Sequence, residues 1–178
     1  GVNGAASITG AVTGSVAEDS TGQVGGSLSI TDEDTDEAVF VAQTSVAGNY
    51  GTFSIDVDSQ WTFAIDNGNR QVQELREGDT LTDSFIVRSA DGTSQTITIT
   101  IRGTNDVAVI SGQSSGSANE GETAQVTGQL FVSDTDSGES GFVSQSDVAG
   151  LYGSFSINSA GQWSYRLDNN NADVQALP

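Results

Sequence analysis

The chain of 178 residues carries a formal net charge of −19, with 24 acidic and five basic residues. This excess of negative charge excludes nucleic acid as a partner and opposes binding to an anionic membrane surface. Because the sequence contains no histidine and no cysteine, it lacks the commonest general base, the commonest thiol nucleophile and the usual ligands of zinc and copper. The oxygen ligands that remain suit calcium.

The predicted elements are mostly strands. Apolar and polar residues alternate in short segments, and the segments are separated by glycine, aspartate and asparagine, which favour turns. In chain order, we expect strands at residues 8–16, 24–30, 39–46, 51–57, 61–66, 81–88 and 94–102, and a short helical turn at 70–77. So many short strands in about one hundred residues predict an all-β, Greek-key sandwich of the immunoglobulin or cadherin type.

The sequence repeats itself at an offset of 102 residues, which aligns Tyr50 with Tyr152 and Trp61 with Trp163. A gapless repeat of this length indicates two copies of one domain in tandem. We expect a complete repeat with its linker at residues 1–106 and a second repeat at 107–178. The second repeat lacks counterparts of residues 77–102, and thus its last two strands. We expect it to be a piece of a longer chain, and completion by another molecule is the alternative.

Acidic residues follow the ends of the predicted strands. If successive strands are antiparallel, the acids after the first and fifth strands of copy one meet the linker and the Asp-x-Asp sequence of copy two. These carboxylates would repel one another unless a cation with several oxygen ligands lay between them. We therefore predict a Ca²⁺ site at the junction, with Glu18, Asp66, Asn105, Asp106, Asp134 and Asp136 as ligands. A weaker site is predicted at the N-terminal end, from Asp32, Asp34 and Asp36.

The same acidic residues and the two tryptophans allow other interpretations. The acidic loops are also compatible with a solvated surface, and Asp66 with a turn cap. An EF-hand is excluded, because the loop that begins at Asp32 lacks the required glycine and the glutamate at its twelfth position. Trp61 and Trp163 could stack on sugars, but both alternate with apolar neighbours, and this pattern predicts that they lie in the core.

Several segments together resemble the VCBS repeat, a cadherin-like module that occurs in tandem in large bacterial surface adhesins and secreted RTX-type adhesins. The resemblance covers copy one and the first two thirds of copy two, and its motifs are 17–19, 28–34, 50–55, 60–67, 81–85, 91–93 and 103–106. It implies a β-sandwich outside the cell that serves attachment or biofilm formation, with calcium between consecutive domains. The linker before copy one departs from the pattern, because Val2–Asn3–Gly4 lacks the aspartate of Asn105–Asp106.

The sequence thus predicts a non-enzymatic, extracellular repeat that acts as a calcium-stiffened spacer of a bacterial cell-surface adhesin. Its expected partners are the neighbouring repeats of the same polypeptide, and no segment is apolar enough to insert into a membrane. The alternative is a module that binds a surface glycan or a protein through the loops of the sandwich. A passive linker without any dependence on metal is a third hypothesis.

Overall fold

The computed structural model describes residues 2–34, 36–122 and 125–178. The chain divides into two compact units, Gly1–Asn105 (unit 1) and Asp106–Pro178 (unit 2). Apart from two short helices, every element within these described ranges is a strand, and the predicted all-β sandwich is confirmed.

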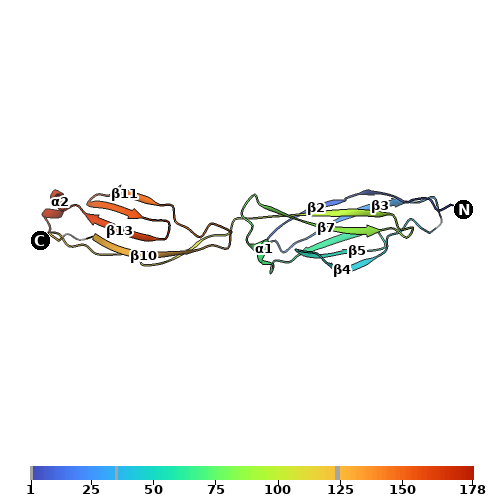
Figure 1. The fold of residues 1–178 in the computed structure, drawn as a ribbon, viewed down its shortest axis with the longest axis horizontal. Coiled ribbons are helices and arrows are strands. Elements are labelled where there is room, and N and C mark those ends of the chain that lie inside the picture. Colours follow the sequence, from blue (N-terminus) through green and yellow to red (C-terminus); the bar gives the residue numbers. More distant parts are fainter. Residues whose placement is uncertain (1, 35, 123–124) are drawn as a thin grey trace. The chain divides into compact units, whose positions relative to one another are not determined.

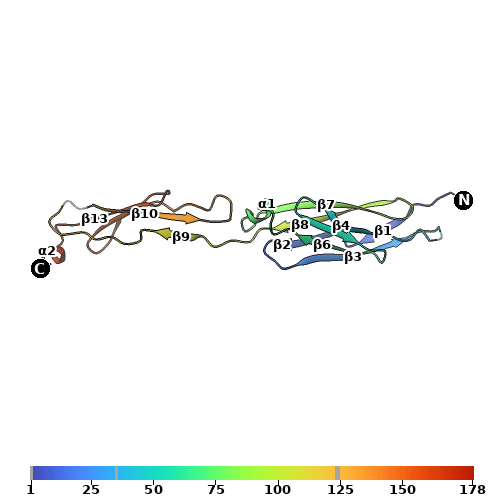
Figure 2. The ribbon, with the colours of Figure 1, turned by 90° about the horizontal axis from the view of Figure 1, so that it is seen from below.

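Unit 1 contains two sheets. The five-stranded sheet has the order β1-β3-β6-β5-β4 and the three-stranded sheet has the order β2-β8-β7. Figures 1 and 2 show that α1 lies at the end of unit 1 remote from the N-terminus. The elements are β1 (Ser7–Gly10), β2 (Thr13–Ala17), β3 (Gln23–Thr31), β4 (Gln43–Ala47), β5 (Gly51–Ile55), β6 (Gln60–Ile65), α1 (Arg70–Gln73), β7 (Thr80–Arg88) and β8 (Ser94–Arg102).

The first predicted strand, 8–16, is two strands that belong to different sheets. β1 pairs antiparallel with β3, whereas β2 pairs parallel with β8. The crossing occurs at Gly10, whose φ of 110° is unfavourable for residues with a side chain. The predicted strand 39–46 also changes sheets, because Phe40 bridges to Ser89 beside β7 before β4 joins β5. Alternation alone could not reveal these crossings, since it continues across them.

The core of unit 1 lies between its sheets. Trp61 is 1% exposed, and Phe53 stacks between Trp61 and Phe85. The Trp61 indole N–H donates to the Ala11 carbonyl oxygen at 2.7 Å, which satisfies the polar atom of this residue. A Cβ at Gly26 would lie 2.7 Å from the Trp61 ring. This glycine therefore makes room for the indole. The core position predicted for Trp61 is confirmed.

The described strands of unit 2 form one sheet, which repeats the five-stranded sheet of unit 1. Its order is β9-β10-β13-β12-β11, and these strands correspond in turn to β1, β3, β6, β5 and β4. Trp163 is buried and donates to the Gln113 carbonyl oxygen at 2.7 Å, as its counterpart Trp61 does to Ala11. The elements are β9 (Val109–Gly112), β10 (Gln125–Ser133), β11 (Gln145–Ala149), β12 (Gly153–Ile157), β13 (Gln162–Leu167) and α2 (Ala172–Gln175).

Both units have a bulge in an edge strand. In β4, the register shifts between Gln43 and Val46, and Ser45 has a positive φ of 51°. In β11, the register shifts at the corresponding place, and Asp147 has a φ of 48°. The backbone N–H of each residue donates to a serine hydroxyl on the neighbouring strand. The bulge is thus built in the same way twice.

Candidate cation-binding ends

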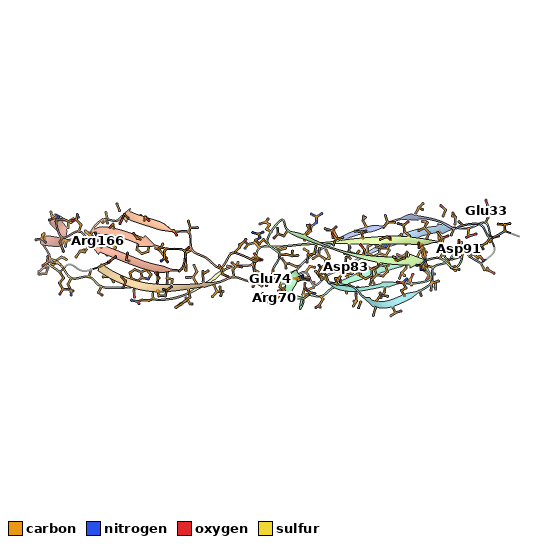
Figure 3. The ribbon with its side chains drawn as sticks, in the orientation of Figure 1. Glu33, Arg70, Glu74, Asp83, Asp91 and Arg166 are labelled. Atoms are coloured by element: carbon orange, nitrogen blue, oxygen red, sulfur yellow. The ribbon has the colours of Figure 1, made fainter. Side chains whose placement is uncertain are left out.

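The acidic residues of unit 1 occupy its turns and loops rather than its sheet faces. Within the described strands of this unit, the single Asp or Glu is Asp83, which is buried. Its Oδ2 accepts a hydrogen bond from the Tyr50 N–H at 3.0 Å, so this carboxylate ties the β4–β5 turn to the opposite sheet. In Figure 3, Asp91 and Glu33 lie at the N-terminal end of the unit, Arg70 and Glu74 at the other end, and Asp83 between them. A solubilising coat would spread acids over the sheet faces, whereas the described acids of unit 1 other than Asp83 lie in its turns, loops and helix cap.

Three carboxylates meet at the N-terminal end of unit 1. Oxygen atoms of Asp32, Asp34 and Glu37 all lie within 4.8 Å of one another. The Asp34 N–H donates to Asp32 Oδ1 at 2.8 Å, and the Gly4 N–H donates to Asp34 Oδ2 at 2.6 Å. Asp32 Oδ2 and Glu37 Oε2 are buried without a hydrogen-bond partner. We call these three residues the unit 1 triad.

Asp91 fixes the N-terminal segment beside this triad. It accepts hydrogen bonds from the Ala6 N–H at 2.9 Å and the Thr93 N–H at 3.0 Å, and also from the hydroxyls of Ser89 and Thr93. The hydroxyl donors and then the backbone donors hold the pKa of Asp91 well below its usual range. Asp91 therefore remains ionised, with its oxygens engaged.

Burial raises the pKa of Glu37, and the negative charges of Asp32, Asp34 and Asp91 raise it further. The neighbouring carboxylates thus oppose the ionisation of Glu37. Of the residues predicted at this end, Asp32 and Asp34 come together. Asp36 is exposed and lies outside the triad. Glu37 was missed, although its position five residues after Asp32 in one acidic loop was a signal.

Unit 2 repeats this arrangement around Asp134 and Asp136. The Asp136 N–H donates to Asp134 Oδ1 at 2.9 Å, and the Asp106 N–H donates to Asp136 Oδ2 at 2.9 Å. Asp106 is the counterpart of Gly4, so the same backbone bond occurs in both copies. Asp136 is only 2% exposed, and its Oδ1 is buried without a hydrogen-bond partner. Glu139, the counterpart of Glu37, is exposed.

At the C-terminal end of unit 1, the structure brings Glu18 and the linker together. Glu18 is 2% exposed, its N–H donates to the Arg102 carbonyl oxygen at 2.9 Å, and its Oε1 accepts from the Thr104 N–H at 2.7 Å. Asn105, also predicted as a ligand, ends the unit directly after Thr104. Asp66 Oδ1 accepts from the Gly68 N–H at 2.9 Å. This bond is the turn-capping role considered for Asp66, and it engages one of the two carboxylate oxygens.

The donor set fits a hard cation. It consists of carboxylate oxygens, several of which are buried without a proton donor. Calcium prefers six to eight oxygen ligands, commonly from Asp and Glu side chains, backbone carbonyls and water. The triad would supply carboxylates to such an ion, and in unit 2 Asp134 and Asp136 would do so.

Residues 3–103 match the family described as the bacterial cadherin-like domain. The chain belongs to this family. The cadherin-like chain is also 26% identical over 152 residues to a protein of Rhizobium johnstonii named calcium-binding lectin RapA2, with 75% of this chain and 64% of the relative covered. The aligned part thus spans less than two thirds of that relative.

The fold of this cadherin-like chain is similar to that of a solved structure. The crystal structure of the protocadherin GammaB4 extracellular domain matches 92% of the chain and 26% of its own length, with a TM-score of 0.50 and 15% sequence identity. Protocadherin Gamma B2 extracellular cadherin domains 3–6 match 98% of the chain and 41% of their own length, with a TM-score of 0.48 and 16% identity. At such low identity, the first match bears on the fold alone. The described residues contain no helix long and apolar enough to cross a membrane.

Proposed function

We propose that this cadherin-like chain is a calcium-stiffened spacer of an extracellular bacterial adhesin. The observation that carries the proposal is the buried Asp136 carboxylate, whose Oδ1 has no hydrogen-bond partner. A buried ionised group without compensation is strongly destabilising, and a bound cation would reverse that cost. Calcium would supply the missing charge. Asp32 Oδ2 and Glu37 Oε2 present the same requirement in unit 1.

The proposed ligands combine these residues with those predicted from the sequence. In unit 1, the triad would bind one cation, with Asp36 outside the first coordination sphere. We retain the prediction that Glu18, Asp66, Asn105 and Asp106 contribute to calcium binding together with Asp134 and Asp136. By neutralising the charge, the ion would allow consecutive repeats of the polypeptide to keep a fixed angle. Extracellular calcium modules commonly have dissociation constants of about 10⁻⁴–10⁻³ M.

The family match and the relative named as a calcium-binding lectin support this function. So does the location of the described acids of unit 1, which lie outside its strands except for Asp83. We place the chain outside a bacterial cell and propose no enzymatic activity for it. The finer assignments, namely the VCBS type of repeat, an RTX-type host protein and a role in biofilm formation, belong to this proposal and come from the sequence motifs.

Calcium titration of the chain by calorimetry, followed by thermal unfolding, tests the proposal. We expect saturable binding and a rise in the unfolding temperature that EDTA abolishes, because the ion binds only the folded chain. Asp136→Asn keeps the acceptor for the Asp106 N–H but removes charge, so it should weaken binding in unit 2. Asp58→Asn removes an exposed turn acid and serves as the matched control. Absence of binding at millimolar calcium would overturn the proposal.

The stiffening is measured separately. Small-angle scattering of the chain should show a narrower distribution of shapes with calcium than with EDTA, and Asp136→Asn or Asp106→Ala should reduce this difference. Calcium binding without any change in scattering would retain the metal site but contradict the spacer mechanism.

One observation favours a second candidate, a ligand-binding module, because the Rhizobium johnstonii relative is named a lectin. In that case the loops at the ends of the sandwich would present calcium to a glycan. A glycan array probed with the chain in calcium and in EDTA separates the two functions. Specific signals that require calcium and are lost in Asp34→Asn or Asp136→Asn would favour the lectin.

A further inference from the structure

The outer face of the sheet in unit 2 is hollowed, and most of the residues that line the hollow are uncharged and polar, with Ile157 and Trp163 also contributing. This hollow has a volume of about 840 Å³ and lies over β10, β12 and β13. No Asp, Glu or Arg lines it, although unit 2 is strongly acidic. The side chains of these strands that the register places on the face opposite Trp163 are Thr127, Gln129, Ser156, Gln162 and Ser164. We call this surface the amide face.

Two of its amides are held in place by hydrogen bonds. Gln129 Nε2 donates to the carbonyl oxygens of Leu130 and Ala160 at 2.6 and 2.8 Å. Gln162 Oε1 accepts from Asn158 Nδ2 at 2.8 Å. Gln129 thus keeps an acceptor for a ligand, and Gln162 keeps a donor. A face with fixed donors and acceptors loses little side-chain entropy when it binds.

An exposed aromatic residue continues this face. Phe131 follows Gln129 by two residues on β10, so both side chains lie on the same side of the sheet, and Phe131 is 60% exposed. Val109 on the neighbouring β9 is also exposed. β9 and β10 pair so that Val109 lies opposite Ser133 and Phe131 opposite Ser111. The two apolar side chains are therefore diagonal neighbours.

The fold does not require these apolar residues. Unit 1 has the same sheet, and the counterparts of Val109 and Phe131 there are Ser7 and Ser29. The amide face also differs, because Gly25 and Ser27 replace Thr127 and Gln129. Nor does the missing second sheet explain the exposure, because the three-stranded sheet of unit 1 packs on the inner face. An exposed aromatic residue beside a polar hollow indicates a binding surface.

We propose that the amide face, together with Phe131 and Val109, binds an uncharged oligosaccharide. Carbohydrate hydroxyls both donate and accept hydrogen bonds, which matches side-chain amides and hydroxyls, and the C–H face of a sugar ring can pack on Phe131. The core of a protein–protein interface is usually rich in apolar and aromatic side chains, whereas most residues that line this hollow are polar. A polyanion would meet the surrounding acidic charge. The surface contains no predicted calcium ligand, and binding there is independent of the metal.

The test is calorimetric titration of the chain with four neutral tetrasaccharides, built from glucose (β1,4-linked and α1,4-linked), from galactose and from N-acetylglucosamine, each in calcium and in EDTA. We expect at least one to bind equally in both conditions. Phe131→Ser, which installs the residue of unit 1, and Gln162→Ala should each weaken binding at least tenfold. The matched control is Gln60→Ala, the counterpart of Gln162 in unit 1, which should leave the affinity unchanged.

Circular dichroism of each variant checks that the fold is kept. The proposal is overturned if none of the four sugars binds, if Phe131→Ser and Gln162→Ala bind as well as the parent chain, or if EDTA abolishes binding. It is also overturned if a tetrasaccharide of uronic acid binds more tightly than every neutral one, or if the surface captures peptides from a display library and no sugar. A failure of calcium binding in the chain would contradict the spacer function and leave this inference standing.

Discussion

Units 1 and 2 share a five-stranded sheet but differ in what packs against it. In unit 1, β2, β7 and β8 cover the inner face, and the residues between the sheets are buried. In unit 2, residues 115–119, the counterparts of β2, form no strand. Ile110 of unit 2 is 60% exposed, whereas its counterpart Ile8 packs against the core of unit 1. The strand β2 is thus formed by its pairing with β8 rather than by local preference.

The same comparison explains the acid after β2. Glu18 is buried because the Arg102 carbonyl of β8 and the Thr104 N–H hold its backbone and carboxylate. Glu120, the counterpart of Glu18 in unit 2, is exposed. A predicted calcium ligand therefore depends on the second sheet for its position. Asp136 does not, because Asp134 and Asp106 already hold it within unit 2.

The largest expected effect comes from restoring the second sheet. Appending the sequence of residues 77–102 after Pro178 should order residues 115–119 and stabilise unit 2 against urea, since each buried apolar side chain contributes about 1.5–3 kcal/mol. Hydrogen exchange measures the ordering. An appended segment with serine in place of Phe85, Val87, Ile97 and Ile99 is the control, and should have little effect. Unchanged exchange at 115–119 with the apolar segment would show that β8 does not form this strand.

Each unit contains one tryptophan, and replacing each by alanine compares the two cores. Trp61→Ala should cost unit 1 about 3–5 kcal/mol of unfolding free energy, because the indole is fully packed. Trp163→Ala should cost unit 2 less, because its inner face is open. Urea unfolding followed by circular dichroism measures both losses, and the fluorescence of the remaining tryptophan identifies the transition of the unmutated unit. Equal losses would mean that the uncovered sheet packs as well as the covered one.

Replacement of Glu18 by alanine should reduce stability more than replacement of its counterpart Glu120. Glu18→Ala leaves the Thr104 N–H without its acceptor, and a loss of about 1–3 kcal/mol in EDTA is expected. Glu120→Ala changes an exposed side chain, so its effect should lie within about 0.5 kcal/mol. Thermal unfolding in EDTA compares them. If Glu18→Ala loses no more stability than Glu120→Ala, the hydrogen bond between Glu18 and the Thr104 N–H contributes nothing measurable.

The smallest expected effect concerns Glu37 and its exposed counterpart Glu139. Burial and the neighbouring carboxylates raise the pKa of Glu37 in the folded state. The folded chain therefore binds this proton more tightly than the unfolded chain, and stability is lost as pH rises through the folded pKa. In EDTA, Glu37→Gln should raise the unfolding temperature near pH 7 and have no effect below the ordinary pKa of glutamate.

In calcium the sign for Glu37→Gln should reverse, because the variant removes a proposed ligand. Glu139→Gln should leave the unfolding temperature unchanged both in EDTA and in calcium, since Glu139 is exposed. A stabilisation by Glu37→Gln that persists in saturating calcium would show that Glu37 does not bind the ion.

Much of the fold follows from local sequence patterns. The alternation in β5, β6 and β8 marks strands with one buried face, and the aligned Trp61 and Trp163 identify the repeat. The exchange of sheets at Gly10 could not be predicted, because both strands keep their alternation and only the partners differ. For the same reason, the predicted strand 39–46 is correct only in its second half, where β4 forms, and its first half bridges to the other sheet.

The part of the candidate site that depends on the spacing of residues in the sequence could be predicted. Asp32 and Asp34 are separated by one residue, and the Asp34 N–H donates a hydrogen bond to Asp32 Oδ1. The Asp-x-Asp pattern therefore predicts the local turn that brings the two side chains together. Glu37 was missed because its approach depends on the path of the loop. Asp36 has a positive φ of 66° and is exposed, whereas Glu37 joins the triad. No periodicity encodes such a turn.

The bulges in β4 and β11 have a consequence for a chain made of similar units. Tethered neighbours of related sequence meet at a very high local concentration, which favours exchange of strands between modules and misassembly during synthesis. A flat edge strand would be the place where such an exchange begins. At Ser45 and Asp147 the bulged backbone N–H is directed to a serine hydroxyl of its own sheet. The bulge therefore makes the β4 or β11 edge of each module a poor partner for a strand of a neighbouring module. At this edge, additional copies add little opportunity for mispairing.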